Sequence, residues 1–287
     1  EIDDIAPVDS IYKMNFNKEG DGETITYTYC IDSCCPLGYN PMKQVVCPRF
    51  IGWISTYEPN SLQPGSHNDK KEMGPIPHIS PYSFFIDVAR GSSPMVAFAA
   101  CPRTDEFANP DNDSNDNNGD NSNSSHWKDA QRDAEQTGVF CVNIVSQELA
   151  WAMNASAAPL GKDLSEFGLM EDGSCTNDNT KDTHSQQRTI PTPMRAPNID
   201  APYVPQSPMF MECRYVKTVK IPDVLENDSM FSLIIGEVIN VHIRKDCVEK
   251  NVGDGKQHHV SIDLEKARPV ARLGYGQEYT VVLEHAK

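Results

Sequence analysis

The segment that most constrains the fold is Phe231–Ile243, which is apolar on both faces when it is extended as a β-strand. Successive side chains of a strand point to opposite faces. The apolar side chains are Leu233, Ile235, Ile239 and Val241 on one face, and Ile234 and Val238 on the other. Such a strand needs cover on both sides, which a barrel interior can supply on one side and a helix or a partner subunit on the other.

Other segments have the length and the apolar or β-branched composition of strands. These segments are Thr24–Cys30, Phe50–Thr56, Ser83–Arg90, Pro94–Cys101, Val139–Val145, Met209–Lys220 and Val270–Leu283. Two helices are expected, at Trp127–Thr137 and Gln147–Ala155. Ser124 or Ser125 can cap the first helix, Gly138 can end it, and Ser146 can cap the second. We therefore predict a mainly β fold, a single barrel with short peripheral helices and long inserted loops.

Polar stretches divide the chain. Residues 1–23 are expected to be a flexible arm, and 24–287 to form the barrel domain. Residues 105–126 are an acidic, low-complexity insertion with few apolar side chains, which favours disorder. Residues 171–206 are Pro-rich and are expected to form a long loop or flap.

The net charge of −16 argues against non-specific binding to nucleic acids or anionic membranes, both of which need a basic surface. No run approaches 18 apolar residues, so no transmembrane helix is expected. Nine cysteines without a visible secretory signal favour reduced thiols in the cytoplasm. The chain does not begin with Met, so a targeting segment removed ahead of residue 1 stays an open alternative.

The cluster of four cysteines is a candidate zinc site. It consists of Cys30, Cys34, Cys35 and Cys47. A zinc site usually shows a paired C-x-x-C repeat or a histidine at the usual spacing. The cluster has neither, so we expect no metal site.

Two segments offer polar groups or flat surfaces to a ligand. Arg49 stands at the start of one predicted strand, and Ser55 and Thr56 stand at its end, giving one cation and two hydroxyls. The segment His78–Phe85 contains Pro81, which fixes φ and biases the preceding residue to an extended shape. Its backbone and aromatic rings could line a flat slot. The simpler interpretations are an exposed arginine with turn-forming hydroxyls, and aromatic side chains of the core.

Two more segments supply cations. Lys128 and Arg132 are four residues apart at the start of a predicted helix, so they share a face near a helix N-terminus, where anions bind. Arg272 precedes a Gly-x-Gly turn, and Tyr279 could stack on a ligand. A solvated charged face and an ordinary glycine turn are the simpler interpretations. The sequence has no G-x-S-x-G, H-E-x-x-H, P-loop or G-x-G-x-x-G motif, and we name no catalytic base.

Taken in order, these segments resemble the flavin-reductase-like family with the FMN-binding split-barrel fold, in its branch of conserved proteins similar to DIM/NTA-monooxygenase components. The matching stretches are 48–56, 80–85, 127–133, 138–158, 164–169, 204–213, 234–243 and 271–279. The resemblance implies a homodimer with FMN at or near the subunit interface and, in many members, hydride transfer between a nicotinamide and flavin. The residues expected to bind the cofactor are Arg49, Trp53, Ser55, Thr56, Ser80, Pro81, Tyr82, Ser83, Lys128, Arg132 and Arg272.

The sequence departs from the family pattern at three positions. Ala130 replaces the threonine of the Lys-Asp-Thr motif, and Asp133 replaces an asparagine three residues further on. His78 replaces an asparagine ahead of the segment that begins at Ser80. Asp133 adds a negative charge near the expected phosphate, so we expect weaker FMN binding or a phosphate displaced toward Arg132.

Three functions follow as hypotheses. The first is an FMN-dependent oxidoreductase of the NAD(P)H:flavin reductase type, which could supply reduced flavin to a partner monooxygenase. The second is a non-catalytic FMN-binding protein that stores flavin or relays electrons. The third is a haem-binding split barrel, for which His78 or His242 would have to be the axial ligand.

Overall fold

The computed structural model describes residues 16–17, 24–25, 45–59, 75–102, 127–171, 189–222, 230–251, 259–274 and 278–282. Most of the expected arm at 1–23 lies outside these residues, as do the 105–126 insertion and the first part of the Pro-rich segment. Ser124, Ser125 and three of the four clustered cysteines (Cys30, Cys34 and Cys35) also lie outside them.

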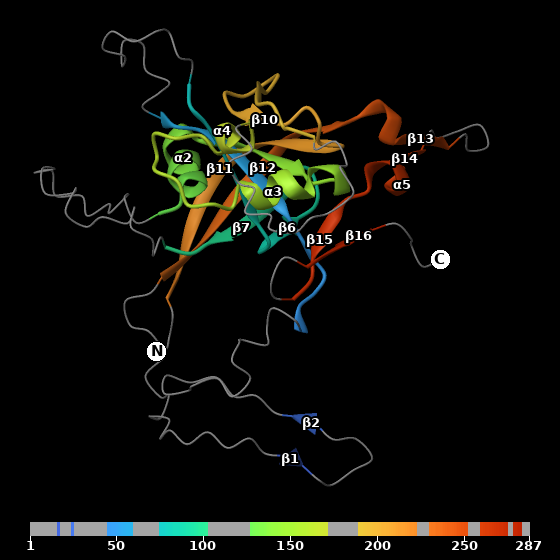
Figure 1. Ribbon diagram of the computed structural model, residues 1–287, viewed down its shortest axis with the longest axis horizontal. Coiled ribbons are helices and arrows are strands. Elements are labelled where there is room, and N and C mark those ends of the chain that lie inside the picture. The colour runs from blue at the N-terminus through green and yellow to red at the C-terminus, as the bar shows by residue number, and fades with distance from the viewer. Residues whose placement is uncertain are drawn as a thin grey trace, which may run out of the picture.

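Seven antiparallel strands form the main sheet, in the order β5-β4-β8-β11-β12-β7-β6. Its two long strands, β11 and β12, run side by side in Figure 1. The strands are β4 (Gly52–Tyr57), β5 (Pro77–Tyr82), β6 (Phe85–Ala89), β7 (Met95–Ala100), β8 (Val139–Ile144), β11 (Met209–Pro222) and β12 (Met230–Ile243). β5 and β6 lie at opposite ends of this order, yet only Ser83 and Phe84 join them. The sheet must therefore curl until its two edges meet, and the predicted mainly β barrel is confirmed.

Shorter elements surround the sheet. The remaining strands are β1 (Phe16–Asn17), β2 (Thr24–Ile25), β3 (Arg49–Phe50), β9 (Met194–Arg195), β10 (Pro202–Tyr203), β13 (Val248–Asn251), β14 (His259–Ile262), β15 (Val270–Arg272) and β16 (Tyr279–Val281). The helices are α2 (Asp129–Thr137), η4 (Gln147–Leu149), α3 (Ala150–Ala155), α4 (Glu166–Glu171), η5 (Lys245–Cys247) and α5 (Leu264–Ala267). β3, β15 and β16 form a small separate sheet.

The core lies on both faces of β4, whose six residues are all buried. Ile54 belongs to a cluster with Phe98, Phe140 and Ile234, which α2 joins through its alanines. The neighbouring residue Trp53 belongs to a second cluster, formed with residues of α3 and α4. Side-chain alternation along one central strand therefore links the barrel to the peripheral helices.

Helix α2 ends as predicted and starts two residues later than predicted. Gly138 follows the helix with φ 76°, a left-handed conformation that glycine adopts at low cost, and its N–H donates to the Ala134 carbonyl. Trp127 lies outside the helix, and its ring packs under the Lys220 ammonium at 3.3 Å from the ring centroid. Lys128 is the N-cap residue, with an extended backbone and no side-chain cap hydrogen bond.

The second predicted helix is divided into η4 and α3. Ser146 precedes η4 as its N-cap residue, but its side chain makes no cap hydrogen bond, so the prediction that this hydroxyl caps the helix is wrong. The residue also forms an isolated antiparallel bridge with Pro269. The backbone of Ser146 therefore both precedes the helix and forms a β-bridge to Pro269.

The predicted two-sided cover of β12 is present on one side only among the described residues. Ile234 and Val238 are buried in the barrel. A register shift at Ile239 breaks the predicted alternation, so Val241 pairs with Met211, which packs on the barrel core. On the opposite face Phe231 is exposed, and Leu233 and Ile235 are partly buried. Exposed apolar residues continue on that face at Val219 and Ile221 of β11 and at Ile86 of β6. We call Ile86, Val219, Ile221 and Phe231 the outer apolar face.

No helix within the described part of the chain is long and apolar enough to cross a membrane.

Candidate functional site

Two adjoining pockets lie where β5 meets the start of α2 and the segment after α3. Pro81, Lys128 and Ala157 line both pockets, so they mark the boundary between them. The first pocket has a cavity volume of about 110 Å³, and the second about 260 Å³. Residues that are distant in the sequence thus share one site.

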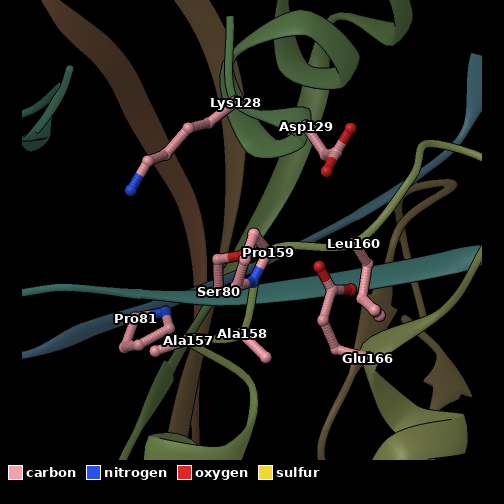
Figure 2. Close-up of a pocket in the computed structure, with 9 residues that line it drawn as sticks. All are labelled: Ser80, Pro81, Lys128, Asp129, Ala157, Ala158, Pro159, Leu160 and Glu166. Atoms are coloured by element: carbon pink, nitrogen blue, oxygen red, sulfur yellow. The ribbon is translucent and has the colours of Figure 1, made fainter. Parts of the chain in front are cut away.

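The first pocket is bounded by charged groups from two helices (Figure 2). Lys128 projects from the start of α2, and Asp129 follows it at the first position of that helix. Ser80 of β5 and Glu166 of α4 stand across the space from them. The segment 157–160 adds a wall without charged residues. This pocket therefore offers one ammonium group, one hydroxyl and two carboxyl groups.

The second pocket combines apolar side chains with a guanidinium. Ile51 and Met153 form part of its wall, together with Ser83 and Arg272. Tyr279 also lines it, and its hydroxyl lies 2.5 Å from Asn154 Oδ1. Burial raises the pKa of Tyr279, so the hydroxyl stays protonated and donates to the asparagine.

A buried polar cluster supports the first pocket from behind. Asp133 Oδ2 lies 2.7 Å from His78 Nδ1 and accepts a hydrogen bond from the Thr56 hydroxyl at 2.8 Å. Arg132 donates to Asp133 Oδ1 at 2.7 Å and to Asp129 Oδ1 at 2.6 Å. The cluster thus joins β4 and β5 to α2.

His78 is a cation in this cluster. Its Nε2 lies 2.9 Å from the Lys162 carbonyl oxygen, and its Nδ1 faces the Asp133 carboxylate. Both partners can only accept, so both ring nitrogens must donate. Burial alone would lower the pKa of His78, but the hydrogen bond and charge of Asp133 outweigh it and raise the pKa to about 9. The nitrogens that would ligate haem are both engaged by the protein.

Five of the predicted cofactor residues line the two pockets. Ser80, Pro81, Ser83, Lys128 and Arg272 do so. Antiparallel pairing of β4 with β5 places Trp53 opposite Pro81 and thus close to the site. The structure therefore brings together residues of β5, the start of α2 and β15, which lie far apart in the sequence.

The other six predicted residues direct their side chains into the protein. Trp53 Nε1 donates to the Ser156 hydroxyl at 2.9 Å. The Ser55 hydroxyl donates to the Pro202 carbonyl at 2.6 Å, and the Thr56 hydroxyl is bound to Asp133. Tyr82 is buried against Phe98, with ring centroids 4.7 Å apart.

The two remaining arginines are also engaged by protein groups. Arg132 is held by the carboxylates of Asp129 and Asp133. Arg49 donates to the carbonyls of Val46 and Gly274, and its guanidinium lies 5.6 Å from the centroid of the Phe84 ring.

Sequence reasoning missed Asn154 and Glu166 as pocket residues. Both lie inside stretches that carry the family resemblance, 138–158 and 164–169. A polar residue within an otherwise apolar helix was the available signal, because such a residue needs a partner. Tyr279, a possible stacking residue by its sequence position, lines the second pocket.

Comparisons with known proteins agree with this architecture. Nitrilotriacetate monooxygenase component B from Bacillus cereus is 20 % identical, with a TM-score of 0.63 over 93 % of this chain and 100 % of that chain. A Shewanella frigidimarina protein with a split barrel domain is 18 % identical, with a TM-score of 0.52 over 83 % and 84 % of the two chains. An FMN-binding protein from Thermus thermophilus is 9 % identical, with a TM-score of 0.50 over 91 % and 99 %.

These solved structures share the split-barrel fold with this chain. The family is assigned by the sequence itself, because the model of the flavin reductase like domain matches residues 83–260, more than half of the chain. The matched range contains the strands β6 to β12 and all of the pocket residues on α2, α3 and α4. This chain belongs to the flavin reductase like domain family.

Proposed function

We propose that the protein is an FMN-binding oxidoreductase that transfers hydride between NAD(P)H and flavin. The observation that carries the proposal is the position of Lys128. Its ammonium borders both pockets and has no ion-pair partner among the described residues. In a chain of net charge −16, a cation that faces a cavity and is not neutralised by the protein suits an anionic ligand.

The groups around the pockets match what FMN requires. Lys128 and Arg272 both line the second pocket, where their positive charges would balance the phosphate. The extended segment Ser80–Ser83 offers backbone groups and a proline edge to a flat ring, and Tyr279 offers an aromatic face. The redox chemistry belongs to the flavin when it is bound, while the protein holds and orients it. We name no proton-donating residue for the hydride transfer.

A homodimer is part of this proposal. The outer apolar face leaves several large apolar side chains of adjacent strands exposed on one side of the sheet. Contiguous apolar patches on a protein surface usually mark an interface. A second copy of the chain would cover this face, and the cofactor could then be enclosed from two sides.

The similar Bacillus cereus protein is component B of a nitrilotriacetate monooxygenase. By analogy, the reduced flavin made here could serve a separate monooxygenase. Such a protein would work in a reducing compartment such as the cytoplasm, in keeping with Cys101, Cys141, Cys213 and Cys247, which are free thiols.

The absorption spectrum of the purified protein, before and after incubation with FMN, tests the proposal. We expect flavin bands that stay with the protein through gel filtration and are released into the supernatant by acid. A protein that retains no flavin after reconstitution would contradict the assignment. Oxidation of NADH or NADPH in the presence of FMN then distinguishes a reductase from a protein that only binds flavin, which would show bound flavin without turnover.

A further inference from the structure

The first pocket contains a buried carboxyl group that the proposed function does not use. Glu166 is the first residue of α4, and only 2 % of its surface is exposed. Figure 2 shows its carboxyl group directed into the cavity from the side opposite Lys128. Its Oε2 accepts a hydrogen bond from the Ile79 N–H at 3.0 Å, at the edge of β5 that does not pair with β4. A buried carboxyl group is thus open to the ligand space.

The neighbouring charges are already paired with one another, and Glu166 is not. Arg132 is bound to Asp129 and Asp133, and His78 is bound to Asp133. Among the described residues, no lysine, arginine or histidine lies within ion-pair distance of Glu166. A buried carboxylate without a cationic partner is costly, so the neutral form is favoured.

The charged and titratable groups around Glu166 come from two elements. From β5 and α2 these groups are His78, Tyr82, Lys128, Asp129, Arg132 and Asp133. The segment 157–160 contributes none. Burial raises the pKa of Glu166 to about 7, although the charge of His78 and the Ile79 N–H act in the opposite direction. The charge of Asp129 adds to the increase.

We propose that Glu166 takes up a proton from solvent when an anionic flavin enters the pocket and returns it when the flavin leaves. This inference rests on the proposed function, since it takes FMN as the ligand. The negative charge of the flavin would disfavour a second negative charge in the same cavity. In this step the Glu166 carboxylate and one proton from the buffer give the neutral acid, with no change of oxidation state. The neutral acid can then donate its O–H to an oxygen of the ligand.

Proton uptake can be measured by titrating the protein with FMN in a calorimeter at pH 7, in PIPES and in imidazole. These buffers differ in their heat of ionisation, so the difference in binding heat reports the number of protons exchanged. A group with a pKa near 7 is about half protonated at this pH, so full protonation on binding takes up about half a proton per site. The FMN phosphate contributes equally in parent and variants.

Two variants test whether Glu166 is the group that takes up the proton. Glu166→Gln can still accept from the Ile79 N–H but cannot titrate, so its proton uptake should fall by about half a proton relative to the parent. Glu171→Gln makes the same change at an exposed position of α4 and should keep the parent value. Infrared spectra of the ligand-free protein should also show a protonated carboxyl band that disappears as the pH rises through 7, and Glu166→Gln should lack it.

The outcomes separate this inference from the proposed function. FMN binding without proton uptake in the parent would overturn the role of Glu166 and leave the proposed function intact. The same conclusion would follow if Glu166→Gln took up as many protons as the parent. If the parent bound no FMN, both proposals would fail.

Discussion

His78 and Asp133 are 55 residues apart in the sequence and bind each other inside the protein, with Nδ1 and Oδ2 2.7 Å apart and both side chains almost fully buried. They are two of the three positions at which the sequence departs from the family pattern, each replacing an asparagine. The structure shows that they form one ion pair. The added negative charge of Asp133 is therefore balanced by His78 and Arg132 and does not act unopposed on the pocket.

This pair should make the stability fall as the pH rises. The pKa of His78 is raised to about 9 in the folded protein, from 6.5 for an unperturbed histidine. The folded state therefore binds the proton more tightly than the unfolded state, and the contribution is complete below pH 6.5 and lost between pH 6.5 and 9. Glu166, with its pKa raised to about 7, acts in the same direction between pH 4.5 and 7.

Urea unfolding at pH 6, 7.5 and 9 measures this dependence. We expect the free energy of unfolding to decrease by on the order of a few kcal/mol from pH 6 to pH 9. His78→Asn should flatten the curve above pH 6.5, whereas His242→Asn, which leaves the pair intact, should keep the parent slope. A parent protein that is equally stable at pH 6 and pH 9 would rule out a buried imidazolium.

Removing the carboxylate alone should be more damaging than removing both members of the pair. Asp133→Asn leaves His78 and Arg132 as buried cations without their main partner, a change that typically costs about 3–5 kcal/mol. The double variant His78→Asn/Asp133→Asn restores the residues usual in the family and should be more stable than Asp133→Asn. Asp163→Asn, at an exposed position, should change stability by less than about 0.5 kcal/mol. Additive single effects would show that the two residues are not coupled.

The proposed role of Lys128 predicts a loss of flavin affinity when its charge is reversed. Lys128→Glu should weaken FMN binding by about 10- to 100-fold or more, the range expected for one lost charge-assisted hydrogen bond. Its melting temperature should stay close to that of the parent, since the side chain is exposed and lies at the N-cap. Lys245→Glu introduces the same charge on η5, away from both pockets, and should leave the FMN dissociation constant within about twofold. Equal FMN retention by Lys128→Glu and the parent would argue against this phosphate site.

The proposed dimer predicts that a charge on the outer apolar face gives monomers. Ile221 is 43 % exposed on β11 and pairs with Phe231, another residue of this face. Ile221→Lys should shift the mass measured by analytical ultracentrifugation from that of a dimer to that of a monomer of about 32 kDa, because a buried lysine without a partner is costly. Val45→Lys, an exposed valine outside this face, should remain dimeric. A parent that sediments as a monomer would refute the dimer.

The sequence predicted the fold better than the site because the two depend on different information. Short apolar runs and Gly138 specify strands and a helix end locally. Whether a hydroxyl binds a ligand or the protein depends on residues far away in the chain. Ser55 and Thr56 were expected at the cofactor, yet their hydroxyls bind Pro202 and Asp133, which lie 147 and 77 residues away. A serine or threonine in the sequence does not indicate which distant residue its hydroxyl will bind.

The packing around a glycine also cannot be predicted from the sequence, because it depends on residues that are distant in the chain. A Cβ added to Gly236 on β12 would lie 2.4 Å from Phe140 Cζ. Phe140 is fully buried and is packed edge-on against Phe98, with centroids 5.6 Å apart, so its ring has little room to move. Gly236→Ala should therefore destabilise the protein by about 1–3 kcal/mol through overpacking.

Gly168 on α4 provides the matched control. A Cβ there would meet no atom within 4 Å, and alanine is favoured over glycine in a helix by up to about 1 kcal/mol. Gly168→Ala should thus be neutral or stabilising in the same urea titration. The identical substitution then has opposite signs at the two positions because only Gly236 faces an aromatic ring of the barrel core. If Gly236→Ala were as stable as the parent, β12 would have to lie further from β8, which carries Phe140, than the structure places it.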